Sequence, residues 1–198
     1  MKKIHINELA EKCKGTKLIV LAGRDDEKNT LYATKVCRYL SGEEKKKCIY
    51  FSLRLEKEMF MGKYSDAPVI IDDTPGLKIE ELLKRVKSAI NSGEIDLIVI
   101  DYLNLLSDQE VKKTRKEELE SIVEKLKLLS EEMKVPILLL ILLSKYVPKD
   151  YPILQEFGGY GDILRFLDEI AYADLVENRF LVLKGDKKRM AQNKIIYC

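Results

Sequence analysis

Residues 17–30, with the sequence KLIVLAGRDDEKNT, constrain the fold more than any other part of the chain. The first half is an apolar run typical of a buried strand, and it leads through Ala22 and Gly23 into a short polar turn. Apolar residues at helical spacing follow over about residues 29–40. A strand, a tight turn and a helix in this order predict one βαβ unit of a parallel sheet.

This layout matches that of a phosphate-binding loop, but the residues that bind phosphate are missing. The working motif is GxxxxGK[ST], in which backbone N–H groups and a lysine hold the phosphates. Counting from Gly23, the second glycine falls on Lys28, the lysine on Asn29 and the hydroxyl on Thr30. Only Thr30 fits, and the acidic residues 25–27 stand where a triphosphate would lie. Ordinary ATP hydrolysis is therefore not expected.

The rest of the chain alternates short apolar runs with helical patterns, which predicts a three-layer α/β fold with a mostly parallel sheet. Strands are expected at residues 48–52, 69–71, 96–106 and 135–141, and helices at 74–93, with Thr74 as N-cap, and at 117–133. Residues 180–183 and 194–197 predict a C-terminal β-hairpin. We expect a single domain over residues 1–198, with a lead-in at 1–16 and a flexible loop at 146–162.

Composition excludes several classes of function. The net charge of +2 argues neither for nor against nucleic acid binding. Four scattered cysteines without a CxxC pair, together with the lone His5, make a zinc site improbable, and Cys37 and Cys48 are expected to be buried. The N-terminus lacks the apolar core of a signal peptide, and the longest apolar run, residues 135–143, is too short to span a bilayer. A reduced, cytoplasmic protein without membrane contact is expected.

Five ordered blocks resemble the RecA-like motor domain of DnaB-type replicative DNA helicases. They are LIVLAGR, IYFSL, IDDTPGLKIEEL, IDLIVIDYLNLL and VPILLL, and the resemblance covers about residues 17–198. The fourth block, residues 95–106, is the most specific. The resemblance implies a RecA-like P-loop NTPase fold and a link to DNA replication. A counterpart of the N-terminal domain of these helicases is not expected.

Carried over residue by residue, the resemblance implies a site from which most catalytic groups are gone. The phosphate lysine corresponds to Asn29, and the catalytic glutamate corresponds to Arg54. The polar sensor after the VPILLL strand corresponds to about Leu142. The Lys-x-Arg pair that reaches a neighbouring subunit corresponds to Lys184 and Asp186. Only Thr30 and Asp101 keep the family's roles, as the hydroxyl and the acid that would hold Mg²⁺.

Several residues allow two readings. Lys28 would replace the missing lysine if the loop shifted by one residue, or it is a solvated lysine in the first helical turn. The acids at 25–27 either fill the loop or cap the helix, and both readings exclude phosphate. Asp101 is a weak Mg²⁺ ligand or an acid left at a strand end. Asp72 and Asp73 are read as a strand end and a turn rather than a second metal site.

The basic residues at the tip of the expected hairpin also have two readings. Lys184, Lys187, Lys188 and Arg189 either contact nucleic acid phosphates or keep an exposed tip soluble.

These readings favour a hydrolysis-deficient relative of the helicase motor, without cofactor, that acts as a binding or assembly module. Single-stranded DNA, a replication protein or further copies of the chain are the expected partners, and a monomer or small oligomer is expected rather than a hexameric ring. Two alternatives stay open. One is a divergent ATPase that uses ATP and Mg²⁺ through Gly23, Arg24, Lys28, Thr30 and Asp101, and the other is a structural remnant.

Overall fold

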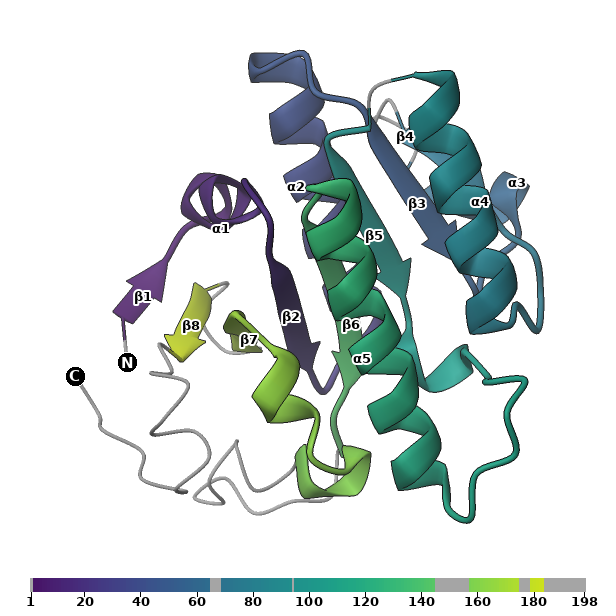
Figure 1. Ribbon diagram of the computed structural model, residues 1–198. Coiled ribbons are helices and arrows are strands. Elements are labelled where there is room, and N and C mark those ends of the chain that lie inside the picture. The colour runs from purple at the N-terminus through teal and green to yellow at the C-terminus, as the bar shows by residue number, and fades with distance from the viewer. Residues whose placement is uncertain (1, 65–68, 94, 145–156, 175–178, 184–198) are drawn as a thin grey trace.

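The chain folds around one twisted β-sheet with helices on both faces (Figure 1). The structure is a computed structural model, and it describes residues 2–64, 69–93, 95–144, 157–174 and 179–183. The order of the eight strands in the sheet is β1-β8-β7-β2-β6-β5-β3-β4. Six of them, from β7 to β4, run parallel, and β8 is antiparallel to both β7 and β1. The expected α/β fold with a mostly parallel sheet is confirmed.

The strands follow the apolar runs of the sequence, because a strand covered on both faces must be apolar throughout. Their bounds are β1 Lys2–Ile4, β2 Leu18–Gly23, β3 Cys48–Ser52, β4 Val69–Asp72, β5 Leu97–Asp101, β6 Ile137–Leu142, β7 Glu169–Asp174 and β8 Arg179–Leu183. All residues of β2, β3 and β5 are buried. The parallel strands all end on one edge of the sheet, which is where ligands bind in open α/β folds.

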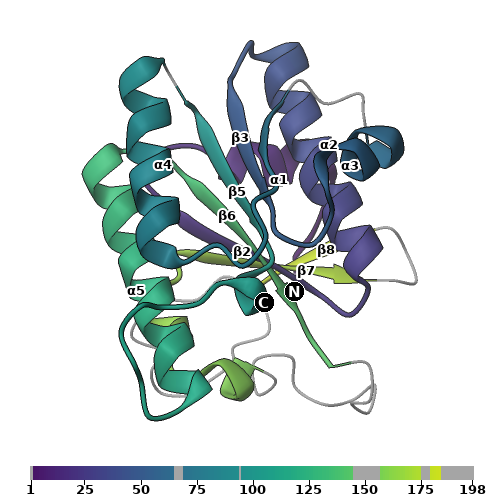
Figure 2. The same cartoon turned by 90° about the vertical axis from the view of Figure 1, so that its right-hand side faces the viewer.

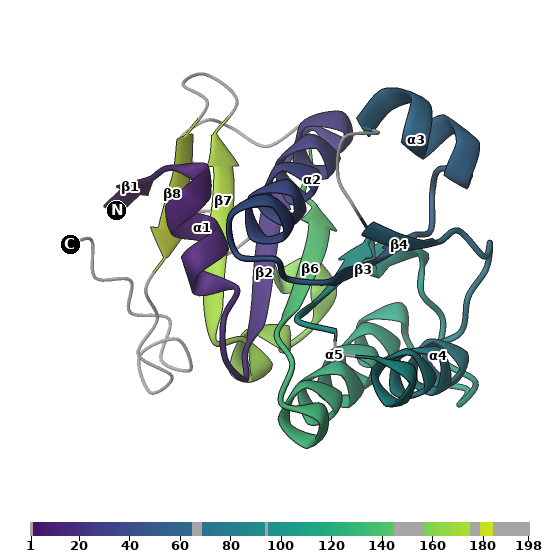
Figure 3. The same cartoon turned by 90° about the horizontal axis from the view of Figure 1, so that it is seen from above.

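The helices form the two outer layers. Their bounds are α1 Ile6–Lys12, α2 Asp26–Glu43, α3 Lys57–Tyr64, α4 Ile79–Ser92 and α5 Arg115–Met133, and three 3₁₀ helices are η1 Leu103–Leu105, η2 Phe157–Tyr160 and η3 Ile163–Phe166. Seen from above, α1, α2 and α3 lie over one face of the sheet and α4 and α5 over the other (Figure 3). The side view shows the same separation (Figure 2).

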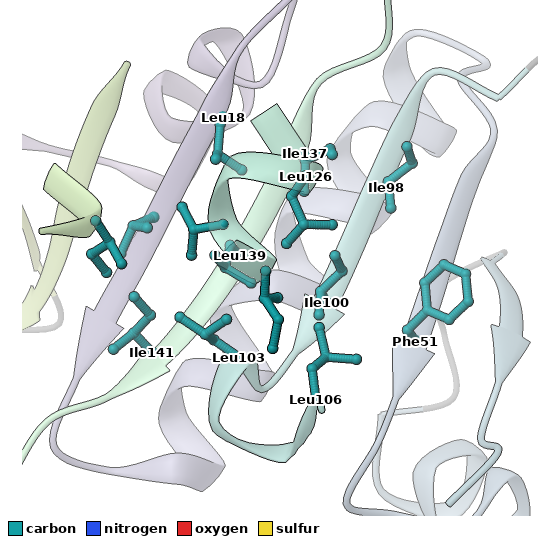
Figure 4. Close-up of a cluster of buried hydrophobic side chains, with 14 of the residues drawn as sticks. Leu18, Phe51, Ile98, Ile100, Leu103, Leu106, Leu126, Ile137, Leu139 and Ile141 are labelled. Atoms are coloured by element: carbon teal, nitrogen blue, oxygen red, sulfur yellow. The ribbon is translucent and has the colours of Figure 1, made fainter. Parts of the chain in front are cut away.

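Side chains alternate between the two faces of each strand, and so the chain has two hydrophobic cores. Leu18, Val20 and Ala22 of β2 pack under α4 and α5, whereas Ile19 and Leu21 pack under α1 and α2. Figure 4 shows part of the first core, where Leu126 of α5 lies over Ile98, Ile137 and their neighbours. The buried positions of Cys37 and Cys48 in the second core agree with expectation.

Several boundaries differ from the sequence prediction. Helix α2 begins at Asp26, three residues before the expected position. Thr74 is not an N-cap, because α4 begins only at Ile79 and the Thr74 hydroxyl donates instead to Asp72. Strand β5 ends at Asp101, since the chain turns into η1 rather than continuing to residue 106.

The two chain ends also differ from expectation. Both edges of β8 are occupied, by β7 and by β1, and so the C-terminal hairpin is formed by β7 and β8. Residues 194–197, the expected second arm, lie outside the described residues. The lead-in at 1–16 forms β1 and α1. Lys12 of α1 forms an ion pair with Glu169 of β7 at 2.6 Å, which ties this segment to the sheet.

The expected flexible loop at 146–162 is described only from residue 157. There the chain forms η2, and Phe157 and Tyr160 are buried. In the part of the chain that the structure describes, no helix has the length and apolar character needed to cross a membrane.

Candidate functional site

The site expected from the sequence lies where β2 passes into α2. Strand β2 ends at Gly23 and α2 begins at Asp26, so only Arg24 and Asp25 connect them. The Asp25 side chain caps the helix by accepting a hydrogen bond from the Lys28 N–H at 3.0 Å. The backbone carbonyl of Asp25 accepts a hydrogen bond from the Asn29 N–H. The residues that would form an open loop around phosphate are therefore the first turn of a helix, and the Lys28 N–H already has a protein acceptor.

The side chain of Asn29, which the resemblance aligns with the phosphate lysine, points inward. Asn29 is fully buried, and its Nδ2 lies 3.4 Å from the carbonyl oxygen of Ile141 on β6. Its Oδ1 lies so close to Gly23 that a Cβ added there would stand 2.1 Å away. Gly23 thus serves here to let the Asn29 amide approach the backbone. The same Oδ1 is buried without a hydrogen-bond partner.

Thr30 and Asp101 are brought together, as their assigned positions require. The Thr30 hydroxyl donates to Asp101 Oδ2 at 2.7 Å, and the Tyr50 hydroxyl at the middle of β3 donates to the same oxygen at 2.7 Å. Thr30 is fully buried and Asp101 is 3% exposed. The other carboxylate oxygen, Asp101 Oδ1, is buried without a partner. The acid is enclosed by protein hydroxyl groups rather than open to solvent.

This enclosure changes the acidity of the groups involved. Burial raises the pKa of Asp101 to about 6, although the hydrogen bonds from Thr30 and Tyr50 favour its charged form. Burial, with the nearby Asp101 charge, also raises the pKa of Tyr50 well above its ordinary value. Tyr50 is therefore a fixed hydrogen-bond donor at neutral pH.

Arg54, which the resemblance aligns with the catalytic glutamate, forms an ion pair. Arg54 Nη1 lies 3.2 Å from Asp26 Oδ2 in the first turn of α2. Lys63 of α3 pairs in the same way with Glu27 at 2.7 Å. The Tyr102 hydroxyl donates to the carbonyl oxygen of Asp26. The N-terminus of α2 is thus bound by side chains that come from three other parts of the chain.

Tyrosine hydroxyls close the rest of this sheet edge. Arg24 donates through Nε to the Tyr172 hydroxyl at 3.2 Å and through Nη1 to the carbonyl of Ser144. The Tyr160 hydroxyl donates to the Leu142 carbonyl at the end of β6. These tyrosines were not singled out in the sequence. No common sequence signal marks them, because Tyr172 lies within β7 and Tyr160 at the end of the glycine-rich η2.

The remaining candidates are distant or not described. Asp72 binds Arg85 at 2.7 Å, and Asp73 accepts from the Lys57 N–H, so both have structural partners. Lys184, Lys187, Lys188 and Arg189 lie outside the described residues. Within the described ranges, no three His, Cys, Asp or Glu side chains are grouped so that they could hold a metal ion.

A nucleoside triphosphate with Mg²⁺ does not fit the residues of this site. The lysine position holds a buried amide, the first turn of α2 and its N-cap carry the three acids at 25–27, and Asp101 is covered by Tyr50 and Thr30. Bound phosphate would face like charge at the helix N-terminus, where anion sites normally present free N–H groups.

The sequence of this chain is similar to those of known proteins. The sequence model of the family described as "DnaB-like helicase C terminal domain" matches residues 58–164, more than half of the chain. The matched span begins after β2, α2 and β3. The replicative helicase DnaB of Geobacillus stearothermophilus is 30% identical over 118 residues, which cover 58% of this chain and 26% of that protein.

Solved structures give the same fold. One that is described as an ATPase domain superposes with a TM-score of 0.74 at 18% identity, over 86% of this chain and 77% of that one. A DnaB-like replicative helicase, solved in a study of its interactions with primase, gives a TM-score of 0.70 at 19% identity, over 81% and 47% of the two chains. The chain spans about a quarter of the Geobacillus helicase. With its RecA-like sheet and this family match, the chain belongs to the DnaB-like helicase C-terminal domain family.

Proposed function

We propose that this chain is a hydrolysis-deficient relative of the DnaB-type motor domain that acts as a binding or assembly module in DNA replication. One observation carries the proposal: the buried Asn29 amide, packed against Gly23, occupies the position of the phosphate-binding lysine. A lysine there would stabilise the charge of the transferred phosphate, and losing one such electrostatic contact typically costs about 10²–10³ in rate.

Two further contacts support the loss of hydrolysis. At the position of the general base stands Arg54, and its guanidinium is held by Asp26 rather than by a substrate. The acid that would share Mg²⁺, Asp101, is covered by hydroxyl donors and has a raised pKa. An active site that lacks the lysine and the base together has little left to align or activate water.

The module would bind a component of the replication machinery. The helicase structure described above was solved for its interactions with primase, and a replication protein of that kind is one candidate partner. Single-stranded DNA is the other, through Lys184, Lys187, Lys188 and Arg189. Neither requires a working nucleotide site.

A titration with a fluorescent ATP analogue and Mg²⁺ tests the proposal. We expect no saturable binding at millimolar nucleotide. We also expect Asn29→Lys to lower the melting temperature without creating binding, because the new ammonium group would be buried. Saturable binding that Lys28→Ala removes would overturn the proposal.

Binding to single-stranded DNA is tested by fluorescence anisotropy with labelled single-stranded DNA at low and moderate salt. Binding should fall when Lys187→Glu and Lys188→Glu are combined. The matched control is Lys84→Glu with Lys57→Glu, which makes the same charge change on α4 and α3. An equal response to both double variants would remove the basic tip as the contact.

A divergent ATPase is the second candidate, and one observation favours it. Thr30 and Asp101 keep the 2.7 Å contact expected of a hydroxyl and an acid that act together, and Asp101 Oδ1 has no protein donor. This candidate predicts nucleotide binding that depends on Lys28, Thr30 and Asp101, and the same titration decides between the two.

A further inference from the structure

Three of the four cysteines of the chain come together in the second hydrophobic core. Cys13 is the C-cap of α1, Cys37 lies in α2 and Cys48 is the first residue of β3. All three are buried, with exposed fractions of 2%, 0% and 1%. The helices that carry Cys13 and Cys37 lie over the same face of the sheet (Figure 3). Three separate elements of the fold thus bring their thiols to one place.

These thiols do not form a metal site. They are not placed so that they could hold a metal ion, either by themselves or with other His, Asp or Glu side chains of the described ranges. They are also free rather than joined in a disulfide bond. The reaction left to neighbouring thiols is their own oxidation, which is reversible at the level of the disulfide.

Two of the thiols are in direct contact, and the contact makes them unequal. The Cys37 thiol donates a hydrogen bond to the sulfur of Cys48. This hydrogen bond lowers the pKa of Cys48, although burial opposes it, and together with burial it raises the pKa of Cys37 well above its ordinary value. The Ser41 hydroxyl oxygen, one turn further along α2, lies 4.0 Å from the Cys48 sulfur. Cys48 is therefore the thiol that more readily becomes a thiolate, which is the nucleophilic form.

A cavity of about 310 Å³ lies beside this group, at the edge of the sheet opposite to the nucleotide position. Its lining includes the apolar side chains of Leu40 and Ile95, the charged Lys46 and Asp96, and Cys13. Cys48 follows Lys46 by two residues, and in the sheet it is paired with Leu97, the residue after Asp96. A cavity of this volume has room for small polar molecules. A neutral oxidant little larger than water can therefore come within one side chain of the Cys48 sulfur.

We propose that Cys37 and Cys48 are an oxidation site, at which hydrogen peroxide converts the two thiols into a disulfide bond between α2 and β3. The Cys48 thiolate attacks one peroxide oxygen, the O–O bond breaks, and the departing hydroxide takes a proton and leaves as water. Cys48 is then a sulfenic acid. Cys37 loses its proton and attacks the Cys48 sulfur, the S–O bond breaks, and a second water leaves. Two thiols lose two electrons in total, and one peroxide is reduced to two waters.

The disulfide bond would fix the second half of α2 to the sheet. The two sulfur atoms must approach from hydrogen-bond contact to about 2 Å, and the short turn over residues 44–47 between α2 and β3 can absorb this shift. The bond would close a short loop, from residue 37 to residue 48, and so restrict the unfolded chain. This inference goes beyond the proposed binding role and does not depend on it, because these cysteines take no part in the nucleotide position.

Peroxide treatment of the folded chain, followed by blocking of the free thiols and peptide mapping, tests the proposal. The variant Cys198→Ser serves as the starting chain, so that this fourth cysteine, outside the described residues, cannot form other links. Trypsin cleaves after lysine and arginine, and so it releases Cys37 in the peptide 36–38 and Cys48 in the peptide 48–54. We expect the two peptides to be recovered as one linked species after peroxide and as separate peptides after dithiothreitol. The oxidised chain should melt on the order of 5 °C higher than the reduced chain.

Single substitutions separate the roles of the two thiols. Cys37→Ser leaves the Cys48 sulfenic acid without a partner, and so trapping of this acid by dimedone should rise severalfold over the starting chain. Cys48→Ser should abolish the link and leave Cys37 unmodified at the same peroxide concentration. The matched control is Cys13→Ser, which removes a thiol of similar burial whose pKa is raised by burial; it should form the link at the rate of the starting chain. Circular dichroism confirms that each variant is folded, and the map of the starting chain needs none of them.

Three outcomes would contradict this inference. The first is a folded chain in which Cys37 and Cys48 both remain free thiols after treatment with millimolar peroxide. The second is a link that forms only in urea concentrations that unfold the chain, because the site would then be closed to the oxidant in the native fold. The third is a link that joins Cys13, rather than Cys37, to Cys48.

Discussion

Replacing Asp101 with asparagine should remove the loss of stability that a buried carboxyl causes as pH rises. The carboxyl is 3% exposed and burial raises its pKa to about 6, against an ordinary value of 3.8. A raised acid pKa means that the folded state holds its proton more tightly than the unfolded state. The stability contributed by the protonated acid is therefore complete below about pH 4 and is lost as pH rises through about 6.

The size of this loss follows from the shift. About two pKa units at 1.36 kcal/mol each give roughly 3 kcal/mol between pH 4 and pH 8. The asparagine side chain would keep an oxygen that can accept from Thr30 and Tyr50, but it has no charge to desolvate. The difference in unfolding free energy between the variant Asp101→Asn and wild type should grow in favour of the variant by about this amount across the window.

Urea unfolding followed by circular dichroism, at half-unit steps from pH 4 to pH 8, measures this difference. Asp96→Asn is the control, because hydrogen bonds from Lys46 and Lys47 outweigh partial burial and lower the pKa of Asp96. Its difference from wild type should not grow in the same direction. If Asp101→Asn and wild type show parallel pH profiles, the buried carboxylate has no desolvation cost and the account of the site is wrong.

Two other substitutions test the packing of the chain. Gly23→Ala should destabilise by about 1–3 kcal/mol, because its Cβ would meet Asn29 Oδ1 at 2.1 Å, and Asn29→Ala in the same chain should cancel part of that loss in a chemical-denaturation double-mutant cycle. Lys125→Met should lower the free energy of unfolding by about 2 kcal/mol or more, because it leaves the fully buried Asp108 side chain without its ion pair at 2.8 Å. The control Lys84→Met, away from any such pair, should change the free energy of unfolding by less than about 0.5 kcal/mol, and chemical denaturation measures both.

The parts of the fold that could be predicted are those whose pattern is local. The sequence predicts β3 at residues 48–52, where the structure has it, because its apolar run is bounded by polar residues. The predicted start of α5 lies within two residues of the observed one, and Leu119, Leu126 and their partners at helical spacing do form its buried face. In both elements the period of the apolar residues matches the period of the structure.

The parts that could not be predicted depend on contacts from distant residues. The capping reading of the acids at 25–27 is confirmed at Asp25, which accepts from the Lys28 N–H, but the earlier start of α2 at Asp26 was not predicted. Arg54 and Tyr102, which are distant in the sequence, also bind this first turn. Helix α3 buries only Phe60 and Tyr64, too few residues to show a helical period. The local apolar pattern therefore does not predict a helix that is stabilised by contacts at its ends or by only one or two buried side chains.

The closeness of Thr30 and Asp101 could be predicted, but the rest of the geometry of the candidate site could not. The family resemblance assigns Thr30 and Asp101 to one site, and the structure has them in hydrogen-bond contact. Spacing could not show that Asn29 turns inward, since an asparagine at the start of a helix usually faces solvent. The sequence spacing also could not show that Tyr50 donates to Asp101, because the pattern within a strand does not tell which residue of another strand a tyrosine contacts.

The residues that the resemblance aligns with catalytic positions are packed against other residues of this chain, and this bears on how substitutions there would act. Arg54 is held by Asp26, and Asn29 is packed under Gly23. Restoring the family's glutamate at position 54 would place a carboxylate beside Asp26 with no cation between them. Restoring its lysine at position 29 would bury an ammonium group. Each single substitution is therefore expected to destabilise the fold, and a chemical-denaturation series on Arg54→Glu and Asn29→Lys would measure that loss.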